Sequence, residues 1–111
     1  MPHDAEPVNV VKASMFRVLG HPARVRILEL LRDGERSVGA LQAELGLDSG
    51  GTSQHLSALR GIGLVESRRE GTSVYYRVDD PNVFELLATA RAIIGRRLVE
   101  QQSILKDLGT P

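Results

Sequence analysis

Residues 37–61 read SVGALQAELGLDSGGTSQHLSALRG, and this stretch decides the fold. Ser37 is a suitable N-cap for a short helix that runs to Leu45, because apolar residues recur there at three- and four-residue spacing. Gly46 ends that pattern. After a turn, a second helix is predicted over about 51–61. Two short helices joined by a tight turn predict a helix-turn-helix.

The pattern on both sides of this stretch predicts further helices and one β-hairpin. Pro22 suits the first turn of a helix, because its missing N–H is not needed there. After Gly63 the period changes, and two short β-prone segments flank a glycine-containing turn at 70–73. Helices are predicted at about 8–19, 23–32, 38–45, 51–61 and 81–108, and strands at 64–69 and 74–78. This order, α-α-α-α-β-β-α, predicts a mainly α protein with a small β-hairpin, a winged helix-turn-helix.

The second helix of the helix-turn-helix has the composition of a DNA-reading helix. A helical wheel turns Thr52, Leu56, Leu59 and Gly63 inward and leaves an outward face of small and polar residues. That outward face consists of Gly50, Ser53, Gln54, Ser57 and Gly61. Short side chains let a helix enter the major groove, where Gln54 can pair with adenine and the serines can donate or accept hydrogen bonds. The alternative is a polar face that is merely solvated.

Two glycines at the start of this helix have two interpretations. Each costs roughly 1 kcal/mol of helix stability, and Gly50 and Gly51 let a phosphate approach the free N–H groups closely. Otherwise the first turn is frayed and simply tolerates glycine. Asp48 or Ser49 can cap the same N–H groups. His55 lies beside the apolar arc, which favours a packing role.

The predicted hairpin supplies the positive charge that the helix lacks. Arg68, Arg69 and Arg77 lie on it, with Thr72 and Ser73 at its tip, and such a wing suits phosphate contact or insertion into a minor groove. With Arg60, residues 50–78 hold four arginines against Glu66 and Glu70. The alternative is that these charges only face solvent.

Composition limits the other classes of function. The 111 residues carry a formal net charge of zero, so DNA binding depends on where the arginines lie. We expect one domain over 1–111, with a core at about 8–108 and loose tails at 1–7 and 109–111. No cysteine is present, which excludes disulfides, thiolate metal sites and thiol redox sensing. There is no glycine-rich phosphate loop and no histidine–carboxylate motif, so we expect no enzyme and no cofactor. Lacking a leader and a long apolar run, the chain is expected in the cytoplasm and not in a membrane.

Several ordered motifs resemble those of one known family. They are LGHPARVRIL at 19–28, SQHLSAL at 53–59, GLV at 63–65, REG at 69–71 and the tyrosine pair at 75–76. Together they are similar to the ArsR/SmtB family of bacterial repressors over roughly residues 12–98. The resemblance implies a homodimer formed through the first and last helices, which accounts for their broad apolar surfaces. The residues that we expect in that interface are Val11, Met15, Leu86, Leu87, Ala90, Ile94 and Leu98.

The resemblance also implies a mechanism and a set of site residues. Repressors of this family bind palindromic operators as dimers and leave the DNA when an effector binds. The family's base readers correspond to Ser53, Gln54 and Ser57, and its wing contact corresponds to Arg69. The complete predicted interface with double-stranded DNA comprises Gly50, Gly51, Thr52, Ser53, Gln54, Ser57 and Arg60 on the helix, and Arg68, Arg69, Thr72 and Ser73 on the wing.

The chain departs from the family at the usual metal sites. Metal-sensing members carry cysteines on the helix that here reads SVGALQ, or paired histidines and acids on the last helix, and this sequence has neither. His3, His21 and His55 fall in three unconnected segments. The effector alternatives are a small organic ligand, a protein, a metal site assembled across the dimer from tail residues such as His3 and Asp4, or none. The rival function is a winged helix that binds protein instead of DNA.

Overall fold

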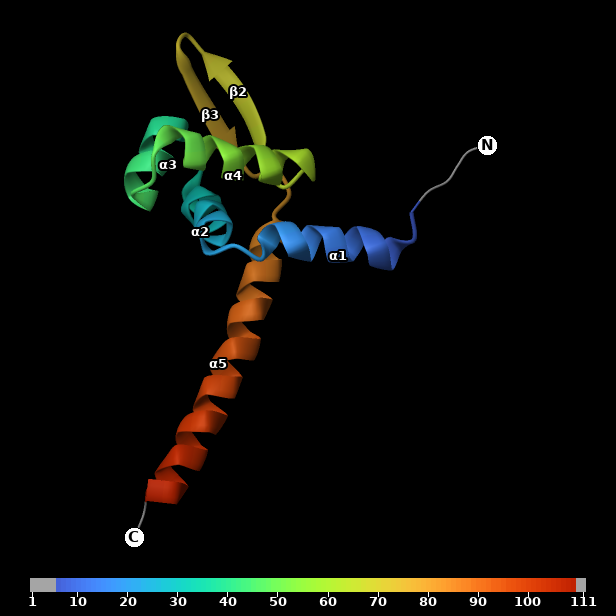
Figure 1. Ribbon diagram of the computed structural model, residues 1–111, viewed down its shortest axis with the longest axis vertical. Helices are drawn as coiled ribbons and strands as arrows, with labels where there is room; N and C mark the ends of the chain where they lie inside the picture. The colour runs from blue at the N-terminus through green and yellow to red at the C-terminus, as the bar shows by residue number, and fades with distance from the viewer. Residues whose placement is uncertain (1–5, 110–111) are drawn as a thin grey trace. The chain divides into compact units, whose positions relative to one another are not determined.

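The computed structural model describes residues 6–109 and contains six helical segments and three short strands within that range. Figure 1 labels the five α-helices and the two strands of the hairpin. Contacts divide the chain into two compact units, Met1–Asp80 and Pro81–Pro111. The first unit contains α1 (Val8–Leu19), α2 (Pro22–Leu30), the 3-10 turn η1 (Leu31–Asp33), β1 (Arg36–Ser37), α3 (Val38–Leu45), α4 (Ser49–Gly61), β2 (Glu66–Glu70) and β3 (Ser73–Arg77). The second unit contains α5 (Asn82–Gly109). The predicted winged helix-turn-helix is confirmed.

Side-chain caps explain where the helices of the first unit begin. The Ser37 hydroxyl accepts a hydrogen bond from the Ala40 N–H at 3.1 Å, as predicted for α3. Asp48, and not Ser49, caps α4, because its carboxylate accepts from the Gly51 N–H at 2.6 Å. His21 caps α2 in the same way, with its Nδ1 3.1 Å from the Ala23 nitrogen. The predicted start of α2 is therefore one residue late, and its end is two residues late because η1 follows.

The sheet has a third strand that the sequence did not predict. Its order is β1-β3-β2, and all neighbours are antiparallel. β1 is only two residues long, so it has no alternation to detect, and Ser37 serves both this strand and the cap of α3. The β2–β3 turn is also tighter than the four residues predicted, because Glu70 and Ser73 already pair across it. Gly71, with φ of 61°, supplies the left-handed backbone that this turn requires.

The core of the first unit holds the helix-turn-helix rigidly. Its fully buried aliphatic side chains come from α2, α3, α4 and the residue before β2: Ile27, Leu28, Leu41, Leu56, Leu59 and Val65. Burying each of these aliphatic groups stabilises the fold by about 1.5–3 kcal/mol. Because α4 contributes two of them from one face, its opposite face has a fixed direction.

Two helices keep apolar surface exposed within their own units. No residue of α1 is buried, and Phe16 is 55% exposed. On α5, Ile94 and Leu98 lie four residues apart on one face and are 57% and 52% exposed. Apolar faces of this kind on a helix are typical of surfaces that bind a partner. Among the described residues, no helix is long and apolar enough to cross a membrane.

Candidate nucleic-acid interface

The outward face of α4 is small, polar and exposed. Ser53, Gln54 and Ser57 are all exposed, whereas Leu56 and Leu59 on the same helix are buried. The helical wheel therefore placed these three side chains correctly. Gly50 is exposed as well, and an added Cβ there would meet only ordinary contact, 3.8 Å from Asp48. This face presents hydrogen-bonding groups without bulk, which is what reading base edges in a major groove requires.

Thr52 does not belong to this face, and its inclusion in the predicted interface is wrong. Its side chain is 0% exposed, and its hydroxyl donates to the Asp48 carbonyl oxygen at 2.9 Å. The helical wheel had already turned Thr52 inward. The residue fixes the first turn of α4 instead of contacting DNA.

The structure gives a third explanation for glycine at position 51, beside phosphate approach and a frayed first turn. A Cβ at this position would lie 3.0 Å from Asp48 Oδ1, the oxygen that accepts the Gly51 N–H. The absence of a side chain therefore lets the carboxylate cap the helix closely. The capping carboxylate also places a negative charge at this terminus, beside the N–H groups that were expected to face a phosphate.

The two faces of the wing differ in charge. The register pairs Ser67 with Tyr76 and Arg69 with Val74, which puts these four residues on one face, called here the inner face. Arg68 pairs with Tyr75 and Glu66 pairs with Arg77 on the outer face. The inner face borders α3 and α4, because its residues line clefts together with Val38, Ser53 and Arg60.

Arg68 is bound to acids within the protein, and its predicted role as a phosphate contact stays a prediction. Its guanidinium makes a forked pair with Glu35, with Nη2 at 2.6 Å from Oε1 and Nε at 2.9 Å from Oε2, and reaches Glu70 at 3.2 Å. It also lies over the Tyr75 ring, 4.7 Å from the centroid. These hydrogen bonds raise the pKa of Arg68, and the same Arg68 bond lowers the pKa of the Glu35 carboxyl. The interaction holds β2 to the segment before β1.

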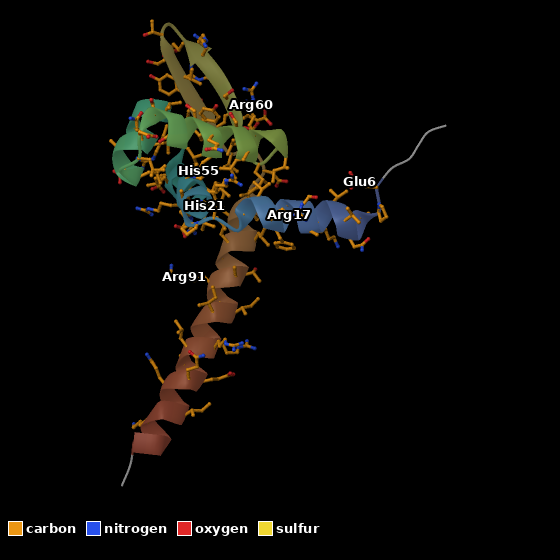
Figure 2. All side chains as sticks on the ribbon, viewed as in Figure 1. Glu6, Arg17, His21, His55, Arg60 and Arg91 are labelled. Carbon is orange, nitrogen blue, oxygen red and sulfur yellow. The ribbon has the colours of Figure 1, made fainter. Side chains whose placement is uncertain are left out.

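Arg77 on the outer face is also paired, since its Nε donates to Asp79 at 2.8 Å. Arg60 and Arg69 differ: within the described part of the chain, neither has an ion pair or a side-chain hydrogen bond. Both are exposed and line one hollow beside the inner face (Figure 2 shows Arg60). Of the four arginines in residues 50–78, these two are the ones available to an anion.

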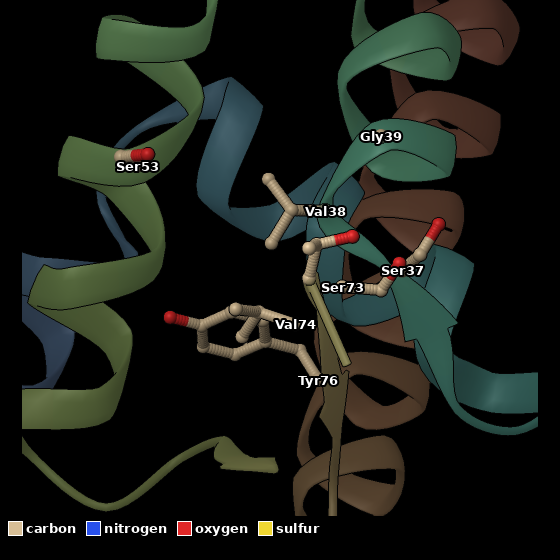
Figure 3. A pocket seen from close by; sticks show the side chains of 8 residues that line it. Ser37, Val38, Gly39, Ser53, Ser73, Val74 and Tyr76 are labelled. Atoms are coloured by element: carbon tan, nitrogen blue, oxygen red, sulfur yellow. The ribbon is translucent and has the colours of Figure 1, made fainter. Parts of the chain in front are cut away.

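A second cleft lies between α3, α4 and the wing, and hydroxyl groups dominate it (Figure 3). Thr72 and Ser73, predicted at the wing tip, are exposed and line this cleft with Ser53. Ser37, Val38, Gly39, Val74 and Tyr76 complete its lining. Sequence reasoning missed Tyr76, although the alternation of Tyr75 and Tyr76 along one strand assigns them to opposite faces.

A polar cluster on the inner side of α4 joins residues that the sequence left unconnected. The His21 and His55 rings lie 4.3 Å apart (Figure 2), and Arg24 Nε donates to His55 Nδ1 at 3.1 Å. Arg24 also donates from Nη1 to the Val18 carbonyl of α1 at 3.2 Å. Burial lowers the pKa of His55, and the neighbouring His21 and Arg24 lower it further. The fold thus brings together two histidines from separate segments of the sequence, and the packing role expected for His55 agrees with its half-buried position.

Among the described residues, no group of three or more histidine, cysteine, aspartate or glutamate side chains is arranged to hold a metal ion. His3 and Asp4, which the tail-site alternative invoked, lie outside the described residues. So do most of the predicted loose tails.

Comparisons with known proteins agree with this geometry. The profile of the family described as bacterial regulatory protein, arsR family, matches residues 21–67. The HTH-type transcriptional regulator Rv0081 of Mycobacterium tuberculosis is 44% identical over 106 residues, which cover 95% of this chain and 93% of that protein. The chain belongs to the arsR family of bacterial regulatory proteins. As an arsR-family member it is a winged-helix transcriptional regulator and not an enzyme.

Solved structures and other arsR-family relatives extend the likeness. The crystal structure of Rv0081 has a TM-score of 0.80 at 45% identity, covering 87% of this chain and 98% of that chain. The solution structure of a homodimeric winged helix-turn-helix DNA-binding domain from Mycobacterium bovis has a TM-score of 0.75 at 34% identity, covering 88% and 94%. A biofilm growth-associated repressor of Agrobacterium fabrum is 37% identical, with 73% of this chain and 69% of that protein covered.

Proposed function

We propose that this arsR-family member is a repressor that binds a palindromic operator as a homodimer and leaves it when an effector binds. The observation that carries the proposal is the exposed polar face of α4, formed by Ser53, Gln54 and Ser57. Arg60 follows on the same helix and Arg69 lies on the inner face of the wing. Base-reading groups and unpaired cations are thus close together on one unit of the molecule.

Each part of this surface has a separate task in the proposal. Ser53, Gln54 and Ser57 read base edges in the major groove, while Arg60 and Arg69 bind phosphates and add no sequence preference. Gly50 allows the start of α4 to approach the DNA closely. Thr72 and Ser73 at the wing tip contact the adjacent backbone. Arg68 orients the wing.

The dimer is proposed to form through α1 and α5. The expected interface residues Val11, Ile94 and Leu98 are all more than half exposed, and Met15, Leu86 and Leu87 are partly exposed. The Mycobacterium bovis neighbour is a homodimer with the same fold. Two α4 helices would then enter successive major grooves about 34–36 Å apart, which requires a palindromic site. With no cysteine in the chain, the effector is not a thiolate-bound metal. A small molecule, a protein, a metal site assembled across the dimer and no effector stay the alternatives. The regulator acts where the bacterial DNA is, in the cytoplasm.

Selection of duplexes from a random DNA pool, followed by affinity measurements at several salt concentrations, tests the proposal. Enrichment of a palindrome and a logarithm of affinity that falls linearly with the logarithm of salt concentration are expected. Gln54→Ala should weaken the free energy of binding by about 1–3 kcal/mol on the enriched site and by little on a scrambled one. Gln42→Ala, a partly exposed glutamine on α3 outside both proposed interfaces, is the matched control and should bind as the wild type does.

Failure to enrich any duplex, with affinity that does not change with salt, would refute DNA binding and favour a protein-binding winged helix. The net charge of zero keeps that second function open. Equal losses of Gln54→Ala on the enriched and scrambled sites would show that Gln54 reads no base.

A further inference from the structure

Tyr76 occupies an unusual position between the wing and the helix-turn-helix. Its side chain is only 9% exposed, and it extends from β3 toward α4 (Figure 3). It borders both clefts beside the inner face, the hydroxyl-lined one with Ser53 and the one that contains Arg60 and Arg69. The ring therefore packs as an apolar residue does, while its edge reaches the surface assigned to DNA.

The phenol hydroxyl of Tyr76 has no protein partner among the described residues. A buried hydroxyl that loses water without gaining a hydrogen bond is unfavourable. Phenylalanine would fill the same space without that cost. A ligand that accepts a hydrogen bond at this point gives the hydroxyl a function.

The groups around this hydroxyl define the ligand as an anion. Arg60 and Arg69 line the same hollow, together with Ser67 and Val74. Arg68 borders it too, but its guanidinium is bound to Glu35 and Glu70. None of the described residues that line the hollow is a carboxylate, whereas Arg68 and Arg77 on the outer face are each paired with an acid. Two unpaired guanidinium groups and two hydroxyls fit an oxyanion with several acceptor oxygens.

We propose that Arg60, Arg69 and the Tyr76 hydroxyl form a seat for one phosphate group between α4 and the wing. Resting on the proposed function, the inference assigns that phosphate to the DNA backbone beside the groove that α4 enters. The two arginines contribute charge, and Tyr76 contributes a neutral, rigidly held donor. Because packing holds the Tyr76 ring in place, the seat fixes the angle between α4 and the bound DNA strand.

A neutral donor and a cation predict different responses to salt. Replacing Arg69 with alanine removes a phosphate neutralisation, so the slope of log affinity against log salt should decrease in magnitude by about 0.9. Replacing Tyr76 with phenylalanine removes one hydrogen bond to a charged acceptor. The affinity should fall about tenfold or more at every salt concentration, with the slope unchanged.

The experiment measures the affinity of the full chain for its selected duplex over a salt series, for the wild type, Tyr76→Phe and Tyr75→Phe. Tyr75 lies at the next position on β3, on the outer face, and is the matched control. Tyr75→Phe should bind as the wild type does. Thermal unfolding of free Tyr76→Phe should occur at an equal or higher temperature, because an unsatisfied hydroxyl is removed; a lower temperature would show that the hydroxyl has a structural partner and would overturn the proposal.

Inorganic phosphate, titrated into the free protein and followed by amide chemical shifts, separates the seat from the proposed function. Shifts at residues 60, 69 and 76 that vanish in Tyr76→Phe support the seat, even for a chain that binds no duplex; the phosphate source is then a free anion and the proposed function fails. Equal DNA affinity of Tyr76→Phe and the wild type, with phosphate shifts that persist in the variant, overturns the seat while leaving the proposed function intact. If Tyr76→Phe loses the phosphate shifts but keeps the DNA affinity of the wild type, the bound phosphate does not come from the DNA backbone, and that part of the proposal is overturned.

Discussion

Arg24 connects three helices, and its removal gives a sharp test of how the recognition helix is held. Arg24→Met keeps most of the aliphatic stem but removes the donors to His55 on α4 and to the Val18 carbonyl on α1. Each bond comes from a charged donor in a half-buried site and contributes about 1–1.5 kcal/mol. We therefore expect the free energy of unfolding to fall by about 2–3 kcal/mol.

Urea unfolding at pH 7.5 and one fixed protein concentration measures this loss, since dimer stability depends on concentration. Arg26→Met is the matched control on the same helix. Arg26 is exposed and lies 3.9 Å from Glu29, a surface pair that contributes little. The control should change stability by no more than about 0.5 kcal/mol. Equal losses in the two variants would refute the coupling role of Arg24.

The same cluster predicts a pH dependence with a definite sign. The pKa of His55 is lowered in the folded protein from its ordinary value of 6.5, mainly by burial and further by His21 and Arg24. The unfolded chain therefore binds a proton more readily than the folded chain does. His55's contribution to stability is complete above pH 6.5 and is lost as the pH falls toward the lower folded value. Arg24→Met removes one cationic neighbour, so its stability should depend less on pH over this range. A steeper dependence in the variant would contradict this explanation.

Three other substitutions test separate parts of the structure. Asp48→Ala removes the carboxylate that accepts the Gly51 N–H and should lower the free energy of unfolding by about 0.5–2 kcal/mol; no change in urea unfolding would show that the cap contributes nothing. Leu59→Ala deletes a fully buried side chain of α4 and should cost about 2–5 kcal/mol in the same assay, whereas a loss below 1 kcal/mol would place Leu59 outside the core. Ile94→Glu puts a charge on the apolar face of α5 and should yield monomers by light scattering; a variant that stays dimeric would show that this face is not the interface.

Local features of the fold were predictable from the sequence because their causes are local. The bounds of α1, the Ser37 cap and the inward turn of Leu56 and Leu59 all follow from spacing within a few residues. The strand β1 was missed because two residues are too few to show a periodic pattern. Its pairing partner on β3 is also distant in the sequence, since Arg36 pairs with Tyr76, 40 positions later.

The parts of the site that sequence reasoning missed depend on distant partners. The ion pair of Arg68 was missed because Glu35, which binds it, is 33 positions earlier in the chain. His21 and His55 belong to motifs that are also far apart, and only the packing of α2 against α4 brings their rings together. Composition correctly indicated a local excess of arginine but could not tell which guanidinium groups are already neutralised.

The inward and outward residues of α4 have separate roles, and this has a consequence for engineering new regulators. Thr52 is bonded within the first turn of α4, and His55 is held on the interior side by Arg24 of α2. The three outward side chains at 53, 54 and 57 make no described side-chain bond to the rest of the protein. The outward positions can therefore be randomised as a library to recognise other operators. A transplant of the whole helix, in contrast, has to carry His21 and Arg24 with it, because His55 without them would be left in a half-buried site with no hydrogen-bond donor.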